Sequence, residues 1–445
     1  MKKTARITIL GGGVAGLSAG YFAGENGLPF TIYEARDRIG GDCATLNVRD
    51  FFFDSGAHRF RNEDAEVTRL IKKLLGDDLR KVDIPSQIYH QGQLIHFPPS
   101  ALNLMRDLGL RSFTRAGLEI VRSRLKPWKP RKNFEDFALF TYGRTIADHF
   151  LLNYSEKLWG IPTKKLSSVI AGTRLKGLGL RRLITETLMG RRVEPGNIEG
   201  SFFYPKKGIC QIAESLAENC GRENILKNSR ITEILCEDGK IQSVIINGKE
   251  VIEIDEVIST LPLPLFLRLM KPAPPGEIMS LANNLHYRDV VLVALFLNRE
   301  WITRAATVYF PDHDFPFTRI YEPRNRSREM SPPGRTSLVA EIPCYRSDKI
   351  WDLPDEKLIQ LVIPRLVQIG WINKEEIIGS AIYRMDHAYP VLEIGFSEKV
   401  ERINDYLKGF GNLMISGRSG TFRYVGMHEV IALGKQMIDE YLPRM

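Results

Sequence analysis

The first 45 residues of the chain carry the feature that most constrains its fold. A short apolar run, Ile7–Leu10, leads into a turn with the spacing GxGxxG, and a helix-like stretch follows. A second apolar run, Phe30–Tyr33, ends at the acidic residue Glu34. A strand, a glycine turn, a helix and a strand closed by an acid form the layout that binds a dinucleotide. The chain is therefore predicted to begin with a dinucleotide-binding βαβ unit.

Each glycine of this turn has its own physical task. Gly11 permits the tight turn, Gly13 lets the backbone approach a pyrophosphate, and Gly16 lets helix and strand pack closely. The helix N-terminus offers unpaired N–H groups and a partial positive charge to the phosphates. Glu34 lies 18 residues after Gly16, where it can accept hydrogen bonds from a ribose diol. An ordinary glycine-rich turn is the alternative, but it leaves the flanking strands and the acid unexplained.

The bulk composition is that of a soluble globular enzyme. The chain has 445 residues, which is enough for two or three domains, and 43% of them are hydrophobic while 26% are charged. No run of 18 or more apolar residues predicts a membrane span, and the apolar run after the N-terminus is too short for a signal peptide. We therefore expect a cytoplasmic protein.

The cysteines and histidines predict neither a disulfide framework nor a metal site. The cysteine count is odd and no pair has CxxC spacing, which argues against disulfides and against a zinc ribbon. The eight histidines are scattered without the spacing of metal ligands. The five cysteines are Cys43, Cys210, Cys220, Cys236 and Cys344.

The net charge of +9 is concentrated in two segments. Residues 111–132 hold eight Lys or Arg against the single acid Glu119, and residues 174–192 hold six against Glu186. A solvated helix face explains such a segment, and so does an anionic substrate or an anionic membrane surface. Nucleic acid is the weaker interpretation, because no nucleic-acid-binding motif accompanies the charge.

The rest of the pattern predicts an α/β fold whose nucleotide domain is discontinuous in sequence. Residues 100–190 are mostly helical in pattern, and residues 204–208 form a turn. The predicted strands are 230–236, 241–246, 251–260, 287–300 and 335–345, with hairpin turns at 237–239 and 247–248. The predicted helices are 62–75, 209–219, 354–370 and 427–441. A last strand at 413–418 runs into a glycine turn, which returns the end of the chain to the nucleotide domain.

Several groups of residues together resemble a flavoprotein superfamily. It includes flavin amine oxidases, protoporphyrinogen oxidases, phytoene desaturases and, more distantly, UDP-galactopyranose mutases. The matching residues are the glycine turn with Glu34, Arg36, Gly40 and Gly41; Asp54, Gly56 and His58; 154–160; Tyr204, Pro205 and Gly208; 259–262; and 417–427. The mutases carry an acidic residue where this chain has Gly426, and the strand block that ends at 259–262 suits the oxidase and desaturase branch better.

The resemblance implies FAD as the cofactor, and it implies a Rossmann-like FAD-binding domain with a mixed sheet-plus-helix substrate domain. The implied FAD-binding parts are 1–95, 201–262 and 406–445, a helical substrate or cap region is 96–200, and the substrate domain of sheet and helices is 263–405. The resemblance implies that the glycine turn binds the pyrophosphate, that Glu34 binds the ribose and that Arg36 stabilises the phosphate side. It also implies that the backbone at Ile231 contacts the adenine. The implied cofactor-binding residues are Gly11, Gly13, Val14, Ala15, Gly16, Glu34, Ala35, Arg36, Gly40, Gly41, Ile231, Gly417, Arg418 and Met427.

Candidate catalytic and substrate residues lie near these landmarks. His58 and Arg59 follow a strand that breaks into a glycine turn, and Tyr424 follows the C-terminal glycines. The alternatives are a histidine satisfied by packing, a solvated arginine and an ordinary core tyrosine. The candidate substrate residues are Lys157, Trp159, Arg174, Tyr389 and Arg423. For Lys157 and Trp159 the alternative is a buried tryptophan beside a lysine whose stem packs on it.

The resemblance implies an FAD-dependent oxidoreductase of the protoporphyrinogen-oxidase and amine-oxidase type. Flavin N5 would abstract a hydride from a C–N or C–C bond of an anionic small molecule, and oxygen or another acceptor would take the electrons. No protein nucleophile is needed, in agreement with the lack of a GxSxG pattern. A non-redox nucleotide-sugar mutase and a binding protein without turnover are the alternatives. The expected partners are the substrate and a membrane surface reached by the basic helices, with no nucleic acid; the sequence does not predict the oligomeric state.

Overall fold

A parallel sheet forms the nucleotide-binding half of the molecule. The computed structural model describes residues 5–97, 101–125, 131–174 and 201–442. Within these ranges, five parallel strands pair in the order β20-β13-β1-β2-β9. Their bounds are Leu413–Ile415 (β20), Glu256–Ser259 (β13), Ile7–Leu10 (β1), Phe30–Tyr33 (β2) and Ile225–Leu226 (β9). Strands far apart in the sequence thus lie side by side. Every residue of β1 and β2 is buried, as expected for a parallel sheet that helices cover on both faces.

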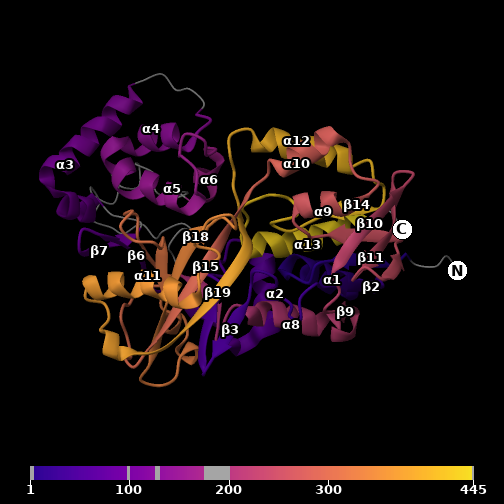
Figure 1. Cartoon of the computed structure of the whole chain (residues 1–445), viewed down its shortest axis with the longest axis horizontal. Helices are drawn as coiled ribbons and strands as arrows, with labels where there is room; N and C mark the ends of the chain where they lie inside the picture. Colours follow the sequence, from indigo (N-terminus) through magenta and orange to yellow (C-terminus); the bar gives the residue numbers. More distant parts are fainter. Residues whose placement is uncertain (1–4, 98–100, 126–130, 175–200, 443–445) are drawn as a thin grey trace.

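Helices cover this sheet. α1 (Val14–Glu25) packs against α13 (Met427–Tyr441) and α8 (Cys210–Cys220), while α2 (Ala65–Leu75) contacts α8 and α13. A Cβ at Gly434 would lie 2.7 Å from the Cβ of Ser18, so a glycine lets α13 approach α1 closely. In Figure 1, α13 lies above α1, and both ends of the chain lie near this half of the molecule.

A mixed sheet forms the second half. In the described part of the chain its seven strands pair in the order β19-β15-β18-β17-β16-β6-β7. The bounds are Ile377–Pro390, Tyr287–Leu297, Thr336–Cys344, Arg319–Tyr321, Val308–Tyr309, Ser86–His90 and Gln93–Phe97, in that order. All residues of β15 are buried. Its alternate side chains enter two different cores, one beneath α11 (Asp355–Gln368) and one facing the helical region, so both faces of the strand are apolar.

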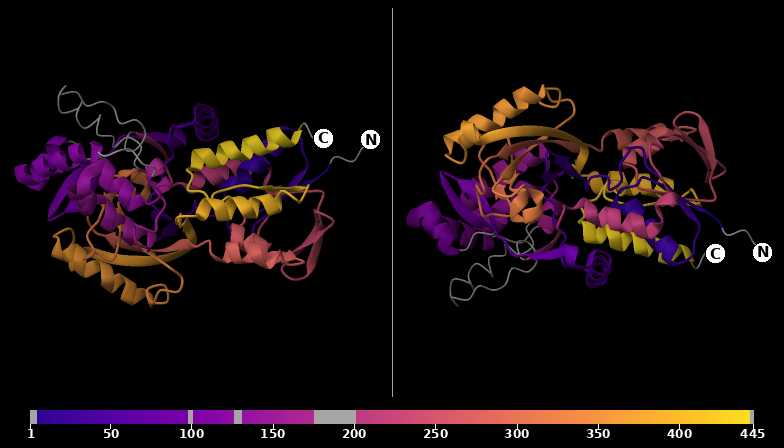
Figure 2. Two further views of the ribbon diagram at one scale, coloured as in Figure 1. Left: turned by 90° about the horizontal axis from the view of Figure 1, so that it is seen from above. Right: turned by 90° about the horizontal axis from the view of Figure 1, so that it is seen from below.

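A helical region caps one end of this sheet. It consists of α3 (Ala101–Arg124), α4 (Phe134–Ile146), a π-helix (Ala147–Leu152), α5 (Asn153–Trp159) and α6 (Val169–Arg174). Both α3 and α4 are kinked at a glycine with positive φ, Gly109 and Gly143. Figures 1 and 2 show this region projecting at the end of the molecule opposite the chain termini. Among the described residues, no helix combines the length and the apolar character needed to cross a membrane.

Smaller elements connect the two halves. A four-stranded sheet in the described residues has the order β12-β11-β10-β14, with β10 Ile231–Glu237, β11 Lys240–Ile246, β12 Glu250–Glu253 and β14 Met270–Lys271. A hairpin joins β3 (Thr45–Val48) to β4 (Phe51–Asp54), and β5 (Leu79–Val82) pairs antiparallel with the distant β8 (Phe202–Pro205). The remaining helices are α9 (Leu263–Leu269), α10 (Gly276–Asn283) and α12 (Phe396–Leu407), with short 3-10 turns at Gly76–Asp78, Arg222–Asn224, Pro323–Asn325, Arg328–Met330 and Lys374–Glu376.

The predicted fold class is confirmed, including the discontinuous nucleotide-binding sheet. Two local predictions need correction. The strand predicted at 251–260 is two strands, β12 and β13, and the turn predicted at 204–208 begins with the last residues of β8. The domain boundaries stay predictions, and β6 and β7 pair within the seven-stranded sheet although they fall largely in the first predicted FAD-binding part. Most of the basic segment 174–192, namely 175–192, and Lys126 and Lys129 lie outside the described residues.

Candidate active site

A cavity of about 980 Å³ lies between the two halves of the molecule and is lined by residues of both. One end is walled by the glycine turn after β1 and by the first residues of α13. The other end lies beneath the helical region. Predicted residues that line it are Gly11, Gly13, Val14, Ala15, Glu34, Ala35, Arg36, Gly40, Gly41, His58, Arg59, Trp159, Ile231, Tyr389, Gly417, Arg418, Tyr424 and Met427. Residues proposed separately for cofactor and substrate thus meet in one space.

The glycine turn is formed by backbone contacts that leave no room for side chains. Gly11 has a φ of +106°, and a Cβ there would lie 2.3 Å from Oγ1 of Thr260. Gly16 does not line the cavity; a Cβ on it would lie 1.9 Å from the carbonyl oxygen of Gly11. Gly16 therefore packs α1 against the turn, the task that the glycine spacing predicts for it.

The carboxylate of Glu34 is held in place at the end of β2. It accepts hydrogen bonds from the backbone N–H groups of Gly12 at 2.7 Å and Arg36 at 2.8 Å, and the side chain is buried. These two donors fix one orientation of the carboxylate at the cavity wall, as recognition of a ribose diol requires. Arg36 was predicted to stabilise the phosphate side of the cofactor. In the structure its Nη2 forms an ion pair with Oδ1 of Asp386 at 2.9 Å.

A second set of glycines narrows the cavity. The N–H of Gly40 donates to the carbonyl of Gly12 at 2.9 Å, and a Cβ at Gly13 would lie 3.7 Å from Cα of Gly41. On the other side, Gly417 has a φ of +79°, and a Cβ there would lie 2.9 Å from Cβ of Ala15. The backbone alone forms these walls, so a long ligand can lie directly against it.

Arg418 places an incompletely bonded cation in the cavity. Its Nε and Nη2 atoms are buried and make no hydrogen bond within the described residues. Its guanidinium carbon lies 5.0 Å from the ring centre of Tyr389 and 4.7 Å from that of Tyr424. A buried donor without a partner is costly, so these atoms suit a negatively charged or polar ligand group. Two helix N-termini, at Val14 and Met427, also line the cavity and favour anions.

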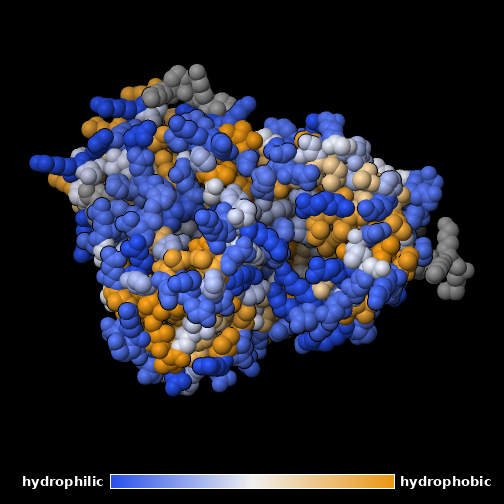
Figure 3. Space-filling model, viewed as in Figure 1, coloured by the Kyte–Doolittle hydropathy of each residue, from blue (hydrophilic) through white to orange (hydrophobic). Residues whose placement is uncertain are grey.

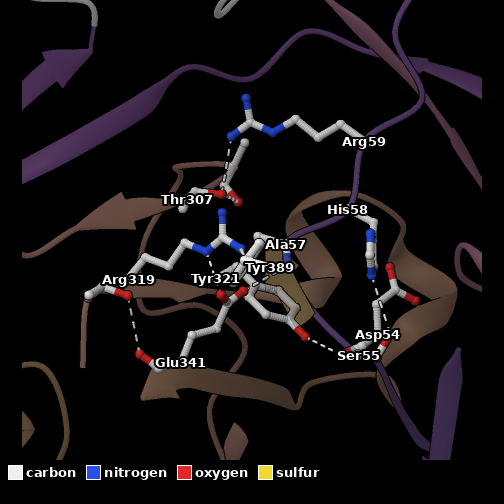
Figure 4. Close-up of polar contacts among 12 residues, drawn as sticks. Asp54, Ser55, Ala57, His58, Arg59, Thr307, Arg319, Tyr321, Glu341 and Tyr389 are labelled. Carbon is white, nitrogen blue, oxygen red and sulfur yellow. Dashed lines mark hydrogen bonds and ion pairs between the residues drawn. The ribbon is translucent and has the colours of Figure 1, made fainter. Parts of the chain in front are cut away.

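His58 is a neutral, buried side chain. Burial lowers the pKa of His58 to about 3, and the positive charges of Arg418, Arg319 and Arg326 act in the same direction. Its Nε2 lies 3.2 Å from Oγ of Ser55, as Figure 4 shows. At neutral pH the imidazole therefore carries no charge, although it faces the cavity.

Arg59 is anchored away from His58. Its Nη2 donates to Oγ of Ser86 at 2.6 Å and to Oγ1 of Thr307 at 3.1 Å, and its guanidinium carbon lies 5.1 Å from the ring centre of Phe202. In Figure 4 the Arg59 side chain extends over Thr307, while the His58 ring points toward Ser55.

A buried ion pair that no sequence pattern predicted lies at the centre of the site. Nε of Arg319 donates to Oε2 of Glu341 at 2.6 Å, and its Nη2 donates to the Tyr389 hydroxyl at 2.7 Å. The other Glu341 oxygen accepts from the N–H of Ala57 at 2.8 Å. Figure 4 shows one guanidinium nitrogen of Arg319 pointing away from Glu341 and Tyr389, and the residue lines the cavity. Arg319 lies on a three-residue strand without any motif, so no sequence signal pointed to it.

Aromatic side chains surround this ion pair. The ring centre of Trp159 lies 5.7 Å from that of Tyr424 and 6.1 Å from that of Tyr389, in edge-to-face arrangements. Trp159 is only 1% exposed. The predicted aromatic residues therefore form one wall, close to Arg418 and Arg319.

The far end of the cavity is apolar. The helical region and β7 supply its lining, and the apolar residues there are Phe97, Phe134, Phe150, Leu151, Leu158 and Ile170. Tyr154 and Tyr309 add hydroxyl groups to the same wall. Tyr154 belongs to the 154–160 run that carried the resemblance, so its signal was present although the residue was not singled out.

Two predicted substrate residues with described side chains, Lys157 and Arg423, are not part of the cavity lining. Nζ of Lys157 donates to the backbone carbonyls of Phe310, Asp312 and Phe317, at 2.8, 2.7 and 3.0 Å. Burial lowers the pKa of this ammonium to about 7, although Asp312 and Asp314 act in the opposite direction. Lys157 thus ties α5 to the loop after β16 instead of facing a substrate. Arg423 is exposed, and the side chain of Arg174 lies outside the described part of the structure.

Within the ranges that the structure describes, no group of three or more His, Cys, Asp or Glu side chains could hold a metal ion. The five cysteines are all free thiols. The charged side chains that line the cavity include arginines such as Arg319 and Arg418 and the carboxyl groups of Glu34, Asp42 and Asp386.

Comparison with known sequences gives consistent results. The family described as flavin containing amine oxidoreductase matches residues 14–380 of the chain. A coproporphyrinogen III oxidase of Bacillus subtilis (strain 168) is 22% identical over 474 residues, covering 98% of this chain and 97% of that protein. A mitochondrial protoporphyrinogen oxidase of Nicotiana tabacum is 22% identical and covers 66% of each chain.

Solved structures share the fold. Reduced UDP-galactopyranose mutase matches with a TM-score of 0.88 at 23% identity, covering 99% of this chain and 96% of that one. Putrescine oxidase bound to putrescine matches with a TM-score of 0.66 at 16% identity, covering 99% of each chain. At such identities the structural likeness establishes the architecture alone.

Proposed function

This chain belongs to the flavin-containing amine oxidoreductase family, and we propose that this FAD-dependent oxidoreductase dehydrogenates a porphyrinogen-type substrate. When bound, FAD accepts the hydride from the substrate and passes the electrons on to dioxygen or to another acceptor. The residues of the chain bind and orient the two molecules and exclude water. The sequence-based prediction of a cytoplasmic location stays a prediction.

The residues at the glycine end suit the cofactor. The backbone of Gly11 and Gly13 with the N-terminus of α1 would hold the pyrophosphate, and the fixed carboxylate of Glu34 would accept from the adenosine ribose. Gly40 and Gly41 would let the ribityl chain pass, and Ile231 would lie near the adenine. Arg418 and the N-terminus of α13 at Met427 would face the polar edge of the flavin.

One observation carries the choice of substrate: the apolar end of the cavity has a cation at its inner boundary. Phe97, Phe134 and Phe150 offer a broad apolar surface. Arg319 pairs across the sheet with Tyr309, whose ring contacts that of Phe97, and it donates a hydrogen bond to Tyr389 of the aromatic wall. A reduced tetrapyrrole has this chemistry, because it has a large apolar ring system with carboxylate side chains. Ligand sites of this kind are mostly apolar, with a few polar groups that fix the orientation.

The other site residues would act by position. Trp159, Tyr389 and Tyr424 would press the substrate ring against the flavin and keep water out. His58 is neutral at working pH, so it would contribute shape and a hydrogen bond without taking up a proton. Tyr389 would hold Arg319 in place through its hydroxyl group.

A steady-state assay tests this proposal. Coproporphyrinogen III and protoporphyrinogen are supplied to the FAD-loaded protein in air, and the fluorescence of the porphyrin product is followed. We expect catalysed porphyrin formation with at least one of them, above the rate of spontaneous oxidation. Arg319→Gln should raise KM more than it lowers kcat, because the guanidinium binds a carboxylate that takes no part in the hydride transfer. Porphyrin formation at the uncatalysed rate would refute the proposal.

A nucleotide-sugar mutase is the second candidate. It is favoured by Arg418, whose guanidinium lies beside the rings of Tyr389 and Tyr424 and has two unbonded nitrogens that would suit a diphosphate. Dithionite-reduced protein incubated with UDP-galactopyranose separates the two candidates. Isomerisation without any net change in flavin oxidation state would support the mutase, and the porphyrinogen proposal predicts none.

A further inference from the structure

A second cavity of about 210 Å³ lies beside the first, between α9, the end of α10, the start of β15 and the end of β19. We call it the α9 pocket. Its apolar lining includes Pro264, Leu285 and Tyr287, which are buried. Pro262 and His387 line both cavities, so these two residues form the partition between them. The volume is below that of a site for a cofactor or a drug-sized ligand, so the α9 pocket suits a small molecule.

Side chains that can donate hydrogen bonds reach the α9 pocket from four separate segments. They are Arg268 on α9, Asn283 at the end of α10, His286 before β15 and Arg346 after β18. Within the described part of the chain, the side chains of Arg268, His286 and Arg346 have no hydrogen bond or ion pair. The guanidinium carbon of Arg346 lies 5.9 Å from the ring centre of Trp351. One unpaired arginine is ordinary on a surface, but here two of them line the same small pocket.

The carboxylate in the α9 pocket is engaged by the backbone. Of the described residues that line the pocket, only Asp289 is acidic, and it is 6% exposed. Its Oδ1 accepts a hydrogen bond from the N–H of His387 at 2.9 Å. That bond holds His387 at a φ of +55°, a conformation that is uncommon for residues other than glycine. Asp289 therefore fixes the partition, and the two guanidinium charges exceed its single negative charge.

We propose that the α9 pocket binds a phosphate group, either as inorganic phosphate or as the phosphate of a small monoester. A phosphate group presents its oxygens in several directions, whereas a carboxylate presents both of its oxygens in one plane. Donors that arrive from four segments therefore match a phosphate better. The apolar side chains of Pro264 and Leu285 border space that a short organic stem would fill.

The α9 pocket is reached from solvent. Arg268, Asn283, His286 and Arg346 are all exposed, so a small ion can meet them directly. In Figure 3, hydrophilic side chains lie beside apolar ones over α9 and α10, which Figure 1 labels. The proposal does not depend on which molecule the first cavity oxidises, because the two cavities are separated by the partition at Pro262 and His387.

Isothermal titration calorimetry of the FAD-loaded full chain tests the proposal at constant ionic strength. Inorganic phosphate, glycerol phosphate and acetate are titrated separately. We expect a Kd below about 1 mM for at least one of the two phosphates, and binding of acetate that is weaker by about tenfold or more. Tighter binding of glycerol phosphate than of inorganic phosphate would identify a monoester as the ligand, and the reverse order would identify the free ion. Arg268→Gln and Arg346→Gln should each weaken phosphate binding at least about fivefold, because each removes a charge-assisted donor.

Arg304→Gln is the matched control. Arg304 is exposed beside Trp301, with its guanidinium carbon 5.4 Å from the ring centre, and it lines neither cavity. The variant loses the same charge and should keep the parental affinity for phosphate. Retained flavin absorbance and circular dichroism show that each variant is folded; the replaced arginines are exposed, so folding should survive. Parental affinity in either Arg268→Gln or Arg346→Gln would overturn the proposal, since the phosphate would then bind elsewhere. So would a Kd above about 1 mM for both phosphates, or acetate that binds as tightly as they do.

Discussion

At the scale of single residues, the site depends on positions where the backbone itself makes the contact. Gly13 and Gly16 illustrate two different reasons for a glycine. A Cβ at Gly13 would meet only the backbone of Gly41, 3.7 Å from its Cα, whereas a Cβ at Gly16 would collide with the carbonyl oxygen of Gly11 at 1.9 Å. The second glycine is therefore required by the fold, and the first has room that we propose a ligand fills.

This contrast predicts different effects for two alanine variants. Gly13→Ala should leave the thermal stability of the FAD-free protein nearly unchanged and weaken FAD binding at least about tenfold, because the methyl group takes space that the pyrophosphate needs. Gly16→Ala should lower the stability of the FAD-free protein itself by several degrees. Calorimetry of the FAD-free proteins and fluorescence titration with FAD measure both quantities. A Gly13→Ala protein with parental FAD affinity would contradict the assignment of the turn.

Lys157 predicts a specific dependence of stability on pH. In the folded protein its pKa is about 7, against an ordinary value of 10.5, so between these values the unfolded chain binds more protons. Stability contributed by this group therefore rises with pH from about 7 to 10.5, by at most about 1.4 kcal/mol per pH unit. Lys157→Met should abolish this gain, as urea unfolding at two pH values within the window would measure. The exposed Lys165→Met is the control; identical pH dependence in Lys157→Met and the parent would disprove the effect.

The geometry of the glycine turn could be predicted from the sequence, whereas no sequence signal pointed to Arg319. Gly11 and Gly16 follow a local spacing, which a single sequence displays, and they form the tight turn and the close packing that this spacing predicts; that Gly13 and Glu34 bind FAD stays a prediction. Arg319 acts through partners on β18 and β19, and no local pattern encodes that meeting of strands. Lys157 was predicted to line the substrate cavity, and its contacts could not be foreseen for a similar reason. Its three partners are backbone carbonyls on a distant loop.

At the scale of elements, long apolar strands and a long amphipathic helix could be predicted from the sequence, and short strands could not. β15 and β18 are buried runs of nine or more residues, and α13 begins and ends where its periodicity does. β16 and β17 have two and three residues and owe their conformation to pairing with neighbours. β19 was not predicted because most of its residues are half-buried and show no alternation.

The ion pair between Arg319 on β17 and Glu341 on β18 predicts how two variants of Arg319 change stability and substrate binding. Arg319→Gln leaves the buried Glu341 without its cation and should cost about 3–5 kcal/mol of stability. Arg319→Lys keeps a charge beside Glu341 but loses the second hydrogen bond to Tyr389, so it should recover most of the stability. Both variants should still show a parental FAD spectrum and a raised KM. An unchanged KM in Arg319→Lys would show that the fork of the guanidinium does not contact the substrate.

At the scale of the whole molecule, the two sheets share one cavity, so cofactor binding should stabilise the entire protein. FAD at a hundredfold excess over its Kd should add about 2.7 kcal/mol to the free energy of unfolding. Thermal unfolding at increasing FAD concentration measures this gain. A melting temperature that does not move with FAD would show that the folded protein does not bind FAD in preference to the unfolded chain.

The central proposal is that FAD and the substrate meet in the cavity that joins both halves. Anaerobic titration of the FAD-loaded protein with coproporphyrinogen III and protoporphyrinogen tests it most directly. We predict that at least one of them bleaches the oxidised flavin absorbance in step with porphyrin formation, and that admitted air restores the absorbance. A protein that holds FAD but keeps its oxidised spectrum with both substrates would contradict it.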